Sequence, residues 1–420
     1  MKVCVIGSGG REHALAWRLS ISPSVTKVYA IPGSAAMSDC AELVGIDWQQ
    51  SNHLISFLKD NQVDLVVVGP EAPLVAGLAD VLNKAGIPVF GPSKAAAQLE
   101  GSKVFAKDLM KKYNIPTAAY GVFHKVDEAK AFIAQTGAPI VVKADGLAAG
   151  KGVVVAMTID EANVAVEDML SGNRFGDAGS TVVIEEFMEG EEASLLAFVD
   201  GKTVVPMIAS QDHKRIFDGD KGPNTGGMGT YAPAPVLTDA LRDAAMKTIL
   251  EPMVAAMEKE GMPYVGCLYA GLMITDEGPK VVEFNARFGD PETQVVLPLL
   301  DSDLGEIMMA CAKGTLTSNM VKWKDSSAAC VILASKGYPE TSSKGDVISG
   351  DIKQYDTTIV FHSGTKLVGE NYVTNGGRVL GVVGLGKDLR TALDRAYGRI
   401  EHIDFEGMQY RTDIGAKAFK

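Results

Sequence analysis

The sequence predicts a protein of several α/β and α+β domains: an N-terminal parallel-sheet domain, a central core with an inserted unit, and a small C-terminal α+β domain. Three observations support this prediction. The chain has 420 residues, more than the ~250–300 at which a single hydrophobic core stops growing. Strand and helix patterns alternate through the first hundred residues, which is typical of a parallel sheet. Strand-like apolar runs begin again after Ser326.

The composition excludes several classes of protein. Lys and Arg total 40 against 52 Asp and Glu, and the net charge of −12 argues against electrostatic binding of nucleic acids or anionic membranes. No apolar stretch approaches the ~20 residues of a membrane span, and the apolar run near the N-terminus is too short for a signal peptide. The five cysteines are scattered without a C-x-x-C pair, so we expect a reduced, cytoplasmic protein.

The first elements are predicted from short apolar runs that end at glycine. Residues 3–6 form such a run before Gly7, and residues 25–30, 64–68 and 87–90 indicate further buried parallel strands. Residues 12–20 carry apolar side chains at helical spacing. Because ligands bind at the carboxyl ends of strands in an open parallel sheet, we expect the glycines after the first strand to border a site.

The remaining elements are predicted in order along the chain. Residues 93–113 indicate a helix interrupted at Gly101, with Ser102 as the N-cap of its second half. Residues 117–190 form a compact α+β unit. Long strands at 194–200, 203–210 and 266–275 follow, with one helix at 239–260 and a strand at 280–284. The C-terminal domain holds strands at 328–334, 357–361 and 378–384, and a helix at 389–400.

The segment GSGGREH, at residues 7–13, joins the first strand to a helix. Backbone N–H groups at such a helix start bind phosphate, and Arg11 beside them suits a monophosphate. Glu12 occupies the third glycine position of the dinucleotide-binding fingerprint, and Asp39 is poorly placed as the ribose acid. We therefore predict a phosphate site rather than a dinucleotide-dependent oxidoreductase, with a plain tight turn as the alternative.

A second glycine-rich motif, IVVKADGLAAGKGV, spans residues 140–153. An apolar strand ends at Lys143, and glycines with a second lysine, Lys151, lead into another strand. Glycine lets the backbone approach phosphate oxygens, and lysine supplies a point charge. The spacing differs from that of a Walker A loop. We predict a loop that binds nucleotide phosphates; the alternative is a flexible hairpin with solvated lysines.

Residues 182–190, VVIEEFMEG, place carboxylates and two large apolar side chains at the end of a strand. An adenine site needs an apolar wall and an acceptor for the exocyclic amine. Glu185 is a candidate for that acceptor, and Glu192 is a candidate ribose ligand. For this segment alone, a charged hairpin edge is the better explanation.

The segment at residues 211–229 is predicted to be a long polar loop that clasps a substrate. It has many glycines and mixed charges, and loops of this length are uncommon unless they are functional. The alternative is a disordered surface loop.

Three polar residues alternate along residues 283–287. In a strand, Glu283 and Asn285 project to one face, and two oxygen ligands at this spacing suit Mg²⁺ that bridges nucleotide phosphates. Arg287 continues the spacing and suits a carboxylate or a phosphoryl group in transfer. A half-exposed strand explains the spacing alone, but not the whole string that follows.

Five segments occur in order along the chain. They are GSGGREH, LEGSK, VVKADGLAAGKGV, QDHKR-x-x-DGD-x-GPNTGGMG and EFNARFGDPETQ, which begin at residues 7, 99, 141, 211 and 283. Together they resemble the glycinamide ribonucleotide synthetase family of the ATP-grasp superfamily, over essentially the whole chain. The resemblance implies an N-terminal αβ domain at 1–102, an ATP-grasp core at 103–325 with a lid at about 118–190, and a C-terminal domain at 326–420.

The resemblance also implies a reaction. Glycine and 5-phosphoribosylamine are joined at the expense of ATP through glycyl phosphate, in the second step of de novo purine synthesis. The expected cofactor is Mg²⁺ or Mn²⁺, and the expected partners are these small molecules, with no nucleic acid or membrane, in a cytoplasmic monomer or weak dimer. Many superfamily members have a second acidic metal ligand where this chain has Ala270-Gly271-Leu272, so the number of metal ions stays open.

The site residues that the resemblance implies fall into four groups. Catalytic contributions are expected from Arg287, Lys143 and Asp212. The expected ATP ligands are Lys103, Lys143, Gly146, Gly150, Lys151, Glu185, Glu186, Phe187, Met188 and Glu192. The expected substrate ligands are Gly9, Gly10, Arg11, Asp212, Lys214, Asn224, Arg287, Gly289, Asp290 and Pro291. The expected metal ligands are Glu283 and Asn285.

Two further readings compete with this one: another ATP-grasp ligase that acts on a purine intermediate, and a nucleotide-binding regulator without catalysis. The QDHKR and RFGDPE strings discriminate against the first, and the intact Lys143, Glu283, Asn285 and Arg287 argue against the second. The turn at residues 375–378 either contributes to the active site or is a simple hairpin.

Overall fold

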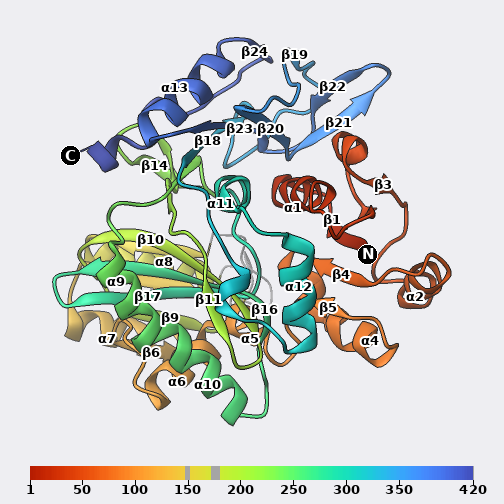
Figure 1. Ribbon diagram of the computed structural model, residues 1–420. Helices are drawn as coiled ribbons and strands as arrows, with labels where there is room; N and C mark the ends of the chain where they lie inside the picture. Colours follow the sequence, from red (N-terminus) through yellow and green to blue (C-terminus); the bar gives the residue numbers. More distant parts are fainter. Residues whose placement is uncertain (147–151, 172–179, 420) are drawn as a thin grey trace.

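A computed structural model describes residues 1–146, 152–171 and 180–419 (Figure 1). The N-terminal sheet is parallel, with the strand order β3-β2-β1-β4-β5. The strands are β1 (Lys2–Gly7), β2 (Lys27–Pro32), β3 (Glu42–Leu43), β4 (Leu65–Val68) and β5 (Val89–Phe90). Their helices are α1 (Gly10–Ser20), α2 (Ser51–Asp60), α3 (Glu71–Ala76) and α4 (Leu78–Lys84), with a 3-10 turn at Ala35–Asp39. These parallel pairings confirm the predicted sheet. Its apolar strands are buried between helices, as is usual for parallel sheets.

The chain then enters a short helical connection. Helices α5 (Gln98–Gly101) and α6 (Lys103–Lys112) are separated at Ser102. The Ser102 side chain accepts a hydrogen bond from the backbone N–H of Phe105 at 3.1 Å, so the predicted N-cap is confirmed.

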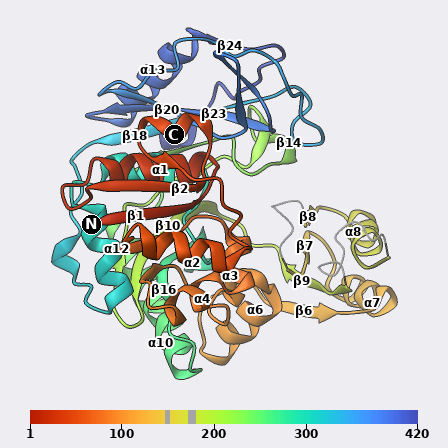
Figure 2. The same ribbon diagram turned by 90° about the vertical axis from the view of Figure 1, so that its right-hand side faces the viewer.

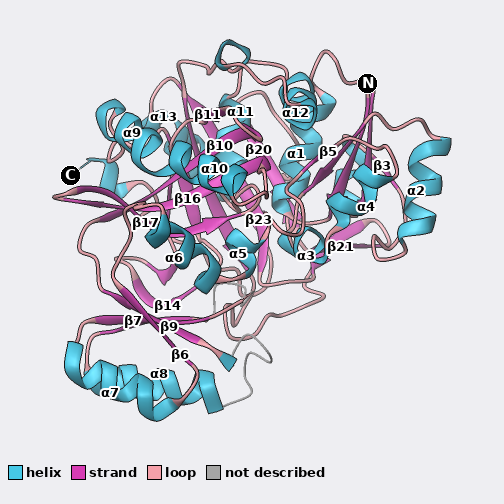
Figure 3. Ribbon diagram, turned by 90° about the horizontal axis from the view of Figure 1, so that it is seen from below, coloured by secondary structure: helices cyan, strands magenta, loops and turns pink. Residues whose placement is uncertain are grey.

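A small antiparallel unit follows and stands apart from the rest of the molecule (Figure 2). Its sheet has the order β6-β9-β7-β8, with β6 (Tyr120–Phe123), β7 (Ile140–Ala144), β8 (Val153–Ala156) and β9 (Val182–Glu186). Helices α7 (Val126–Thr136) and α8 (Ile159–Ser171) cover one face of that sheet (Figure 3). This unit, which we call the lid, has its own hydrophobic core.

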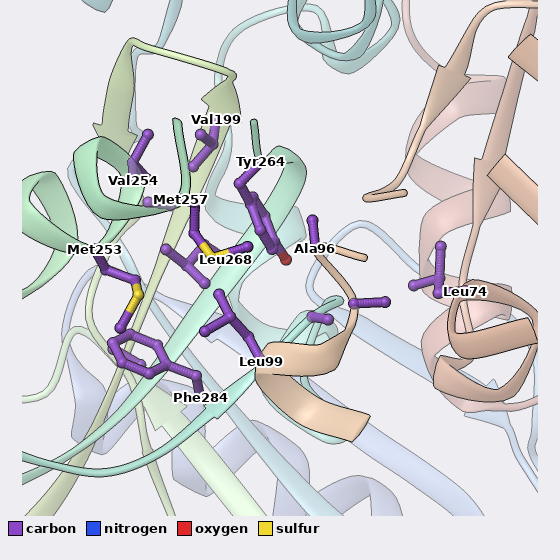
Figure 4. Packing of buried hydrophobic residues seen from close by; sticks show 14 of the residues in the cluster. Leu74, Ala96, Leu99, Val199, Met253, Val254, Met257, Tyr264, Leu268 and Phe284 are labelled. Carbon is purple, nitrogen blue, oxygen red and sulfur yellow. The ribbon is translucent and has the colours of Figure 1, made fainter. Parts of the chain in front are cut away.

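The central sheet is antiparallel, with the order β11-β10-β16-β17. Its strands are β10 (Glu191–Asp200), β11 (Val204–Pro206), β16 (Val265–Thr275) and β17 (Gly278–Asn285). The predicted helix at 239–260 is helical throughout, but it comprises α9 (Asp239–Ala245), a π-helical turn (Met246–Leu250) and α10 (Glu251–Lys259). Met253 and Met257 of α10 pack against strand residues such as Leu268 and Phe284 (Figure 4).

The C-terminal sheet has the order β12-β15-β18-β23-β20, and its first two strands come from far earlier in the chain. They are β12 (Gln211–Asp212) and β15 (Gly229–Ala232), which join β18 (Ser327–Ala334), β20 (Thr358–His362) and β23 (Arg378–Gly386). Helix α13 (Leu389–Ile400) packs on this sheet, as predicted. Two small strand pairs, β19 (Ser349–Gly350) with β24 (Ile403–Asp404) and β21 (Thr365–Val368) with β22 (Asn371–Thr374), flank it.

The prediction of a polar loop over 211–229 is therefore wrong in part. Between β12 and β15 the chain forms a separate hairpin, β13 (Arg215–Phe217) with β14 (Lys221–Asn224). An apolar run is the signal that predicts a buried strand, and this segment has none because its residues are mostly polar or glycine. Its backbone groups pair instead with β18, where Thr230 lies opposite Cys330.

Two helices, α11 (Thr293–Leu299) and α12 (Leu304–Lys313), connect the central sheet to the C-terminal sheet. Short 3-10 turns follow at Ser318–Met320 and Ala416–Phe419. Within the described part of the chain, no helix has the length and apolar character needed to cross a membrane.

Candidate active site

The glycine-rich turn after β1 is shaped by Glu12. Its carboxylate accepts a hydrogen bond from the backbone N–H of Gly9 at 2.8 Å, and its side chain packs against the Cα atoms of Gly7 and Gly69, where a Cβ would clash with it. Gly7 also has a φ of +123°, which favours glycine. Glu12 therefore occupies the switch point between β1 and β4, the place that a dinucleotide pyrophosphate would need.

A cavity of about 560 Å³ opens beside this turn, a volume that fits a small-molecule ligand. The backbone of Gly7, Ser8 and Gly9 lines one side, and Asp47 and Trp48 line another. The predicted Gly9 thus borders a cavity at the carboxyl end of β1.

The two arginines expected near the substrates, Arg11 and Arg287, meet at one carboxylate. An oxygen of Glu71 lies 3.8 Å from Arg11 and 3.4 Å from Arg287. Arg287 also donates to Glu100 at 2.7 Å, and Glu100 accepts from the backbone N–H of Ala286 at 2.7 Å. Burial opposes the charge on Arg287, but Glu100 and Glu71 outweigh it and hold the pKa of Arg287 above its ordinary value. The N-terminal turn and the end of β17 are therefore joined through the half-buried carboxylate of Glu71.

Two lysines predicted to bind ATP phosphates lie near the base of the lid. Lys143 Nζ is 2.9 Å from a carboxylate oxygen of Glu185 and donates to the carbonyl of Val282 at 3.0 Å. Lys103 Nζ donates to the carbonyl of Gly146 at 2.9 Å. Gly150 and Lys151, predicted on the same loop, lie outside the described residues.

The predicted adenine-binding segment links the lid to the central sheet. Glu185 is buried at the end of β9, Glu186 is exposed, and Phe187 and Met188 are half-buried in the connection to β10. Glu192, on β10, forms an ion pair with Lys214 at 2.6 Å. The segment is therefore placed where a change in lid position would move it relative to β10.

The predicted metal ligands lie on β17, the edge strand of the central sheet. Burial raises the pKa of Glu283, but Lys214, Lys143 and Lys103 outweigh it, so the pKa lies below its ordinary value. Gly271 of β16 lies opposite Glu283, which leaves no acid beside it on that strand. Asn285 Oδ1 is 3.5 Å from Arg287. An ionised carboxylate and an amide oxygen on one strand face fit a divalent cation that also takes phosphate oxygens.

The described residues contain no cluster of three or more His, Cys, Asp or Glu side chains that would hold a metal ion by themselves. A cation here would therefore have to take its further ligands from a nucleotide or from water.

Asp212 and Lys214 lie between the central sheet and the β13–β14 hairpin. Burial, reinforced by repulsion from Glu292, raises the pKa of Asp212 to about 8. The raised pKa favours the protonated form of Asp212, which can donate a hydrogen bond. Lys214 is anchored by Glu192, and its carbonyl accepts from the backbone N–H of Thr225 at 2.7 Å.

The turn at residues 375–378 does reach the site. Arg378 donates to the carbonyl of Gly226 at 2.7 Å and to the carbonyl of Asp290 at 2.8 Å, and its second nitrogen lies 3.2 Å from the Asp290 carboxylate. Burial raises the pKa of Asp290, but Arg378 outweighs it and holds the pKa below its ordinary value. The predicted substrate residues 289–291 are thus tied to the C-terminal domain.

The tip of the β13–β14 hairpin is held by the C-terminal segment. Arg411 lies 2.8 Å from Asp220 and 2.7 Å from Asp413, and it donates to the carbonyl of Arg215 at 3.1 Å. The backbone N–H of Thr412 donates to Asp218 at 2.9 Å. Among the described strands the hairpin pairs with no third one, so these contacts help to fix its position.

Sequence reasoning missed several residues of this region. Lys107 is buried and lies 2.9 Å from Glu185, and its spacing of four residues from Lys103 on one helix face was an available signal. Arg378 lies in the turn at residues 375–378, which the sequence already offered as a possible contributor. Glu71, Glu100 and Arg411 had no such signal, because each meets its partners only through the tertiary fold.

Comparison with known proteins gives a consistent result along the chain. Residues 1–100, 101–293 and 328–417 match the N domain, the ATP-grasp (A) domain and the C domain of phosphoribosylglycinamide synthetase. Phosphoribosylamine--glycine ligase of Halalkalibacterium halodurans is 53% identical over 418 residues, which is 100% of this chain and 97% of that protein. The enzyme of the same name from Neisseria meningitidis serogroup A is 54% identical over 420 residues, or 100% and 99%.

Solved structures agree. The crystal structure of phosphoribosylamine--glycine ligase from Thermotoga maritima superposes with a TM-score of 0.87 at 34% identity, covering 99% of this chain and 100% of that one. Biotin carboxylase from Campylobacter jejuni has a TM-score of 0.75 at 15% identity, covering 97% and 92%, and this likeness concerns the fold alone.

Proposed function

The chain belongs to the phosphoribosylglycinamide synthetase family, and from this premise we propose that it catalyses the ATP-dependent ligation of glycine to 5-phosphoribosylamine. The products are glycinamide ribonucleotide, ADP and phosphate, in the second step of de novo purine biosynthesis. The observation that carries the proposal is identity above 50% to enzymes of that name over the full length of the chain.

ATP is proposed to bind between the lid and the central sheet. Lys103 and Lys143 neutralise its phosphates, assisted by the backbone of the loop from Gly146 through Gly150 to Lys151. The segment of Glu185, Glu186, Phe187 and Met188 frames the adenine, and Glu192 binds the ribose. Support comes from the position of both lysines near the base of the lid, where their Nζ atoms already contact oxygen acceptors.

A divalent cation, Mg²⁺ or Mn²⁺, is proposed to bind Glu283 and Asn285 and to supply positive charge to the nucleotide phosphates. The lowered pKa of Glu283 supports this proposal, because the carboxylate is ionised at neutral pH. Gly271 opposite Glu283 favours few protein ligands, so phosphate oxygens would complete the shell.

The chemistry is proposed to proceed in two steps. The glycine carboxylate attacks the γ-phosphorus of ATP in line, which forms glycyl phosphate and releases ADP. The amine of phosphoribosylamine then attacks the carbonyl carbon, loses a proton, and expels phosphate. No protein nucleophile is needed, because positioning and charge neutralisation by Lys143 and Arg287 lower the barrier. Exclusion of water protects the acyl phosphate.

The acceptor substrates are proposed to lie between the N-terminal turn and the β13–β14 hairpin. The backbone of Gly9 and Gly10, with Arg11, suits the ribose phosphate at the start of α1. The residues assigned to the remaining substrate groups are Asp212, Lys214, Asn224, Arg287, Gly289, Asp290 and Pro291. The protonated Asp212 would donate a hydrogen bond to a substrate oxygen. We further propose a cytoplasmic monomer or weak dimer that uses only these small molecules, without nucleic acid or membrane partners.

The test is ADP release by the purified protein with each substrate omitted in turn. We expect release to require ATP, a divalent cation, glycine and freshly formed phosphoribosylamine. Rapid ADP release with bicarbonate in place of glycine would instead indicate a carboxylase-type ATP-grasp enzyme. ATP binding without any turnover would indicate a nucleotide-binding regulator.

A further inference from the structure

A buried three-residue ion network lies at the base of the lid. Lys107 Nζ is 2.9 Å from one carboxylate oxygen of Glu185, and Lys143 Nζ is 2.9 Å from the other. The side chains of all three residues are at most 4% exposed. Two cations therefore share one anion almost out of contact with water, and the network carries a net positive charge.

The two lysines are held differently. Lys107 lies on α6 and donates to the hydroxyl of Thr117 at 2.7 Å and to the carbonyl of Ala118 at 3.5 Å, and its ammonium lies over the Tyr120 ring. These contacts are local to α6 and the chain that follows it. Lys143 comes from β7 of the lid and contacts the carbonyl of Val282 beside the proposed metal ligands. Lys143 thus has a second partner toward the reaction site, whereas the partners of Lys107 within the described residues all lie on the other side, apart from the shared Glu185.

From this arrangement we propose that Lys107 is a positioning residue for ATP: it neutralises and orients the Glu185 carboxylate, so that Lys143 is available to the phosphates. This inference rests on the proposed role of Lys143 in ATP binding. Without Lys107, the buried Glu185 carboxylate would keep one ion pair among the described residues, the one with Lys143. Drawing Lys143 away would then leave the buried Glu185 carboxylate unpaired, which is costly. The ATP phosphates would therefore have to compete with Glu185 for Lys143.

The proposal makes an unusual prediction about a double variant. Lys107→Met should raise the KM for ATP by about tenfold or more, because Glu185 retains Lys143. Glu185→Gln removes the charge that retains Lys143, so Lys107→Met should raise the KM for ATP less in the Glu185→Gln background than in the unchanged protein, whatever Glu185 itself contributes to ATP binding. Lys107→Arg, which keeps the charge, should stay within about threefold of the unchanged protein.

The experiment compares KM values for ATP, glycine and phosphoribosylamine in the full chain carrying Lys107→Met, Glu185→Gln, both, or Lys107→Arg. Lys112→Met is the matched control, because Lys112 lies on the same helix and pairs with the exposed Glu260 at 2.6 Å. If Lys107→Met does not fold, Lys107→Gln takes its place. Thermal unfolding of each variant is measured alongside.

The expected result is a selective rise in the KM for ATP in Lys107→Met, a smaller rise when Lys107→Met is added to Glu185→Gln, and no change in Lys112→Met. An unchanged KM for ATP in Lys107→Met, an equal rise for all three substrates, or the same rise with and without Glu185→Gln would overturn the inference. Failure of the proposed function is distinguishable from these outcomes, since the unchanged protein would then show no glycine-dependent turnover at all.

Discussion

Replacing Arg411 by methionine should release the β13–β14 hairpin from the C-terminal segment. The Arg411 side chain is 1% exposed and pairs with Asp413 at 2.7 Å and with Asp220 at 2.8 Å. Methionine is unbranched like arginine, so the substitution keeps part of the buried packing but removes these charge-assisted bonds. Because Asp220 lies at the tip of the hairpin, the lost contacts weaken its attachment to the C-terminal segment, while the bonds from Thr412 and Lys417 remain.

The size of the effect follows from the surroundings of the two carboxylates. Breaking a buried ion pair by removing one partner costs about 3–5 kcal/mol. Here the side chains of Asp220 and Asp413 are 37% and 26% exposed, and Asp220 keeps Lys417 at 2.6 Å. The orphaned carboxylates still reach water, so we expect about 3 kcal/mol, at the low end of that range.

A loss of this size should favour hairpin opening by about a hundredfold, since each 1.4 kcal/mol is worth about tenfold in an equilibrium constant. Limited chymotrypsin digestion reports this opening at Phe217, because the rate of cleavage follows the population of the open form. The KM for glycine or for phosphoribosylamine should rise by about tenfold, while the KM for ATP stays within about twofold.

Arg399→Met is the control for this prediction. Arg399 has a side chain that is 9% exposed, lies on α13 of the same domain and pairs with Asp351, away from the hairpin. It should lose stability without faster cleavage at Phe217 and without a change in KM. The reasoning is refuted if Arg411→Met keeps both the cleavage rate and the KM values of the unchanged protein, or if both variants behave alike.

Three further predictions concern the nucleotide and its cation. Glu283→Ala should lower kcat by at least about a hundredfold while the circular dichroism spectrum stays native, and a near-normal rate would contradict the assignment. Chelation with EDTA should abolish activity, and added Mg²⁺ or Mn²⁺ should restore it in the unchanged protein but not in Glu283→Ala. Burial lowers the pKa of Lys107 to about 8, although the attraction of Glu185 raises it. Lys143, which lowers this pKa further, and the Tyr120 ring also face the Lys107 ammonium. Lys107 is charged below that pH and neutral above it, so the KM for ATP should rise between pH 7 and 9, and a flat profile would count against the role of Lys107.

Much of the fold could be predicted because its strands are apolar runs that end at glycine or proline. The first strand, predicted at residues 3–6, is β1 (Lys2–Gly7), and the predicted C-terminal helix agrees with α13 at both ends. The strands β12 and β15 could not be found in this way. They are short and mostly polar. β12 pairs with β15, and the other partner of β15 is β18, about a hundred residues away, so little in the local sequence indicates them.

The residues of the candidate site show the same difference between those that a local pattern indicates and those that only the fold brings together. Lys143, Glu283 and Asn285 could be singled out because each ends an apolar strand or alternates along one. Lys107 and Arg378 carried only weak signals, namely the spacing of Lys107 from Lys103 and the turn that ends at Arg378, because a lysine in a helix and an arginine after a glycine turn are ordinary surface residues until the fold buries them. Prediction of such residues needs the partner as well as the position, and here those partners are Glu185 and Asp290.

In the proposed mechanism, the glycine carboxylate attacks ATP before the amide bond forms. Glycine labelled with ¹⁸O in its carboxyl group tests this directly, with the released phosphate analysed by mass spectrometry. We expect one labelled oxygen to pass from each glycine to the phosphate in every turnover that forms product. Unlabelled phosphate, with the label retained in glycine or lost to water, would contradict it.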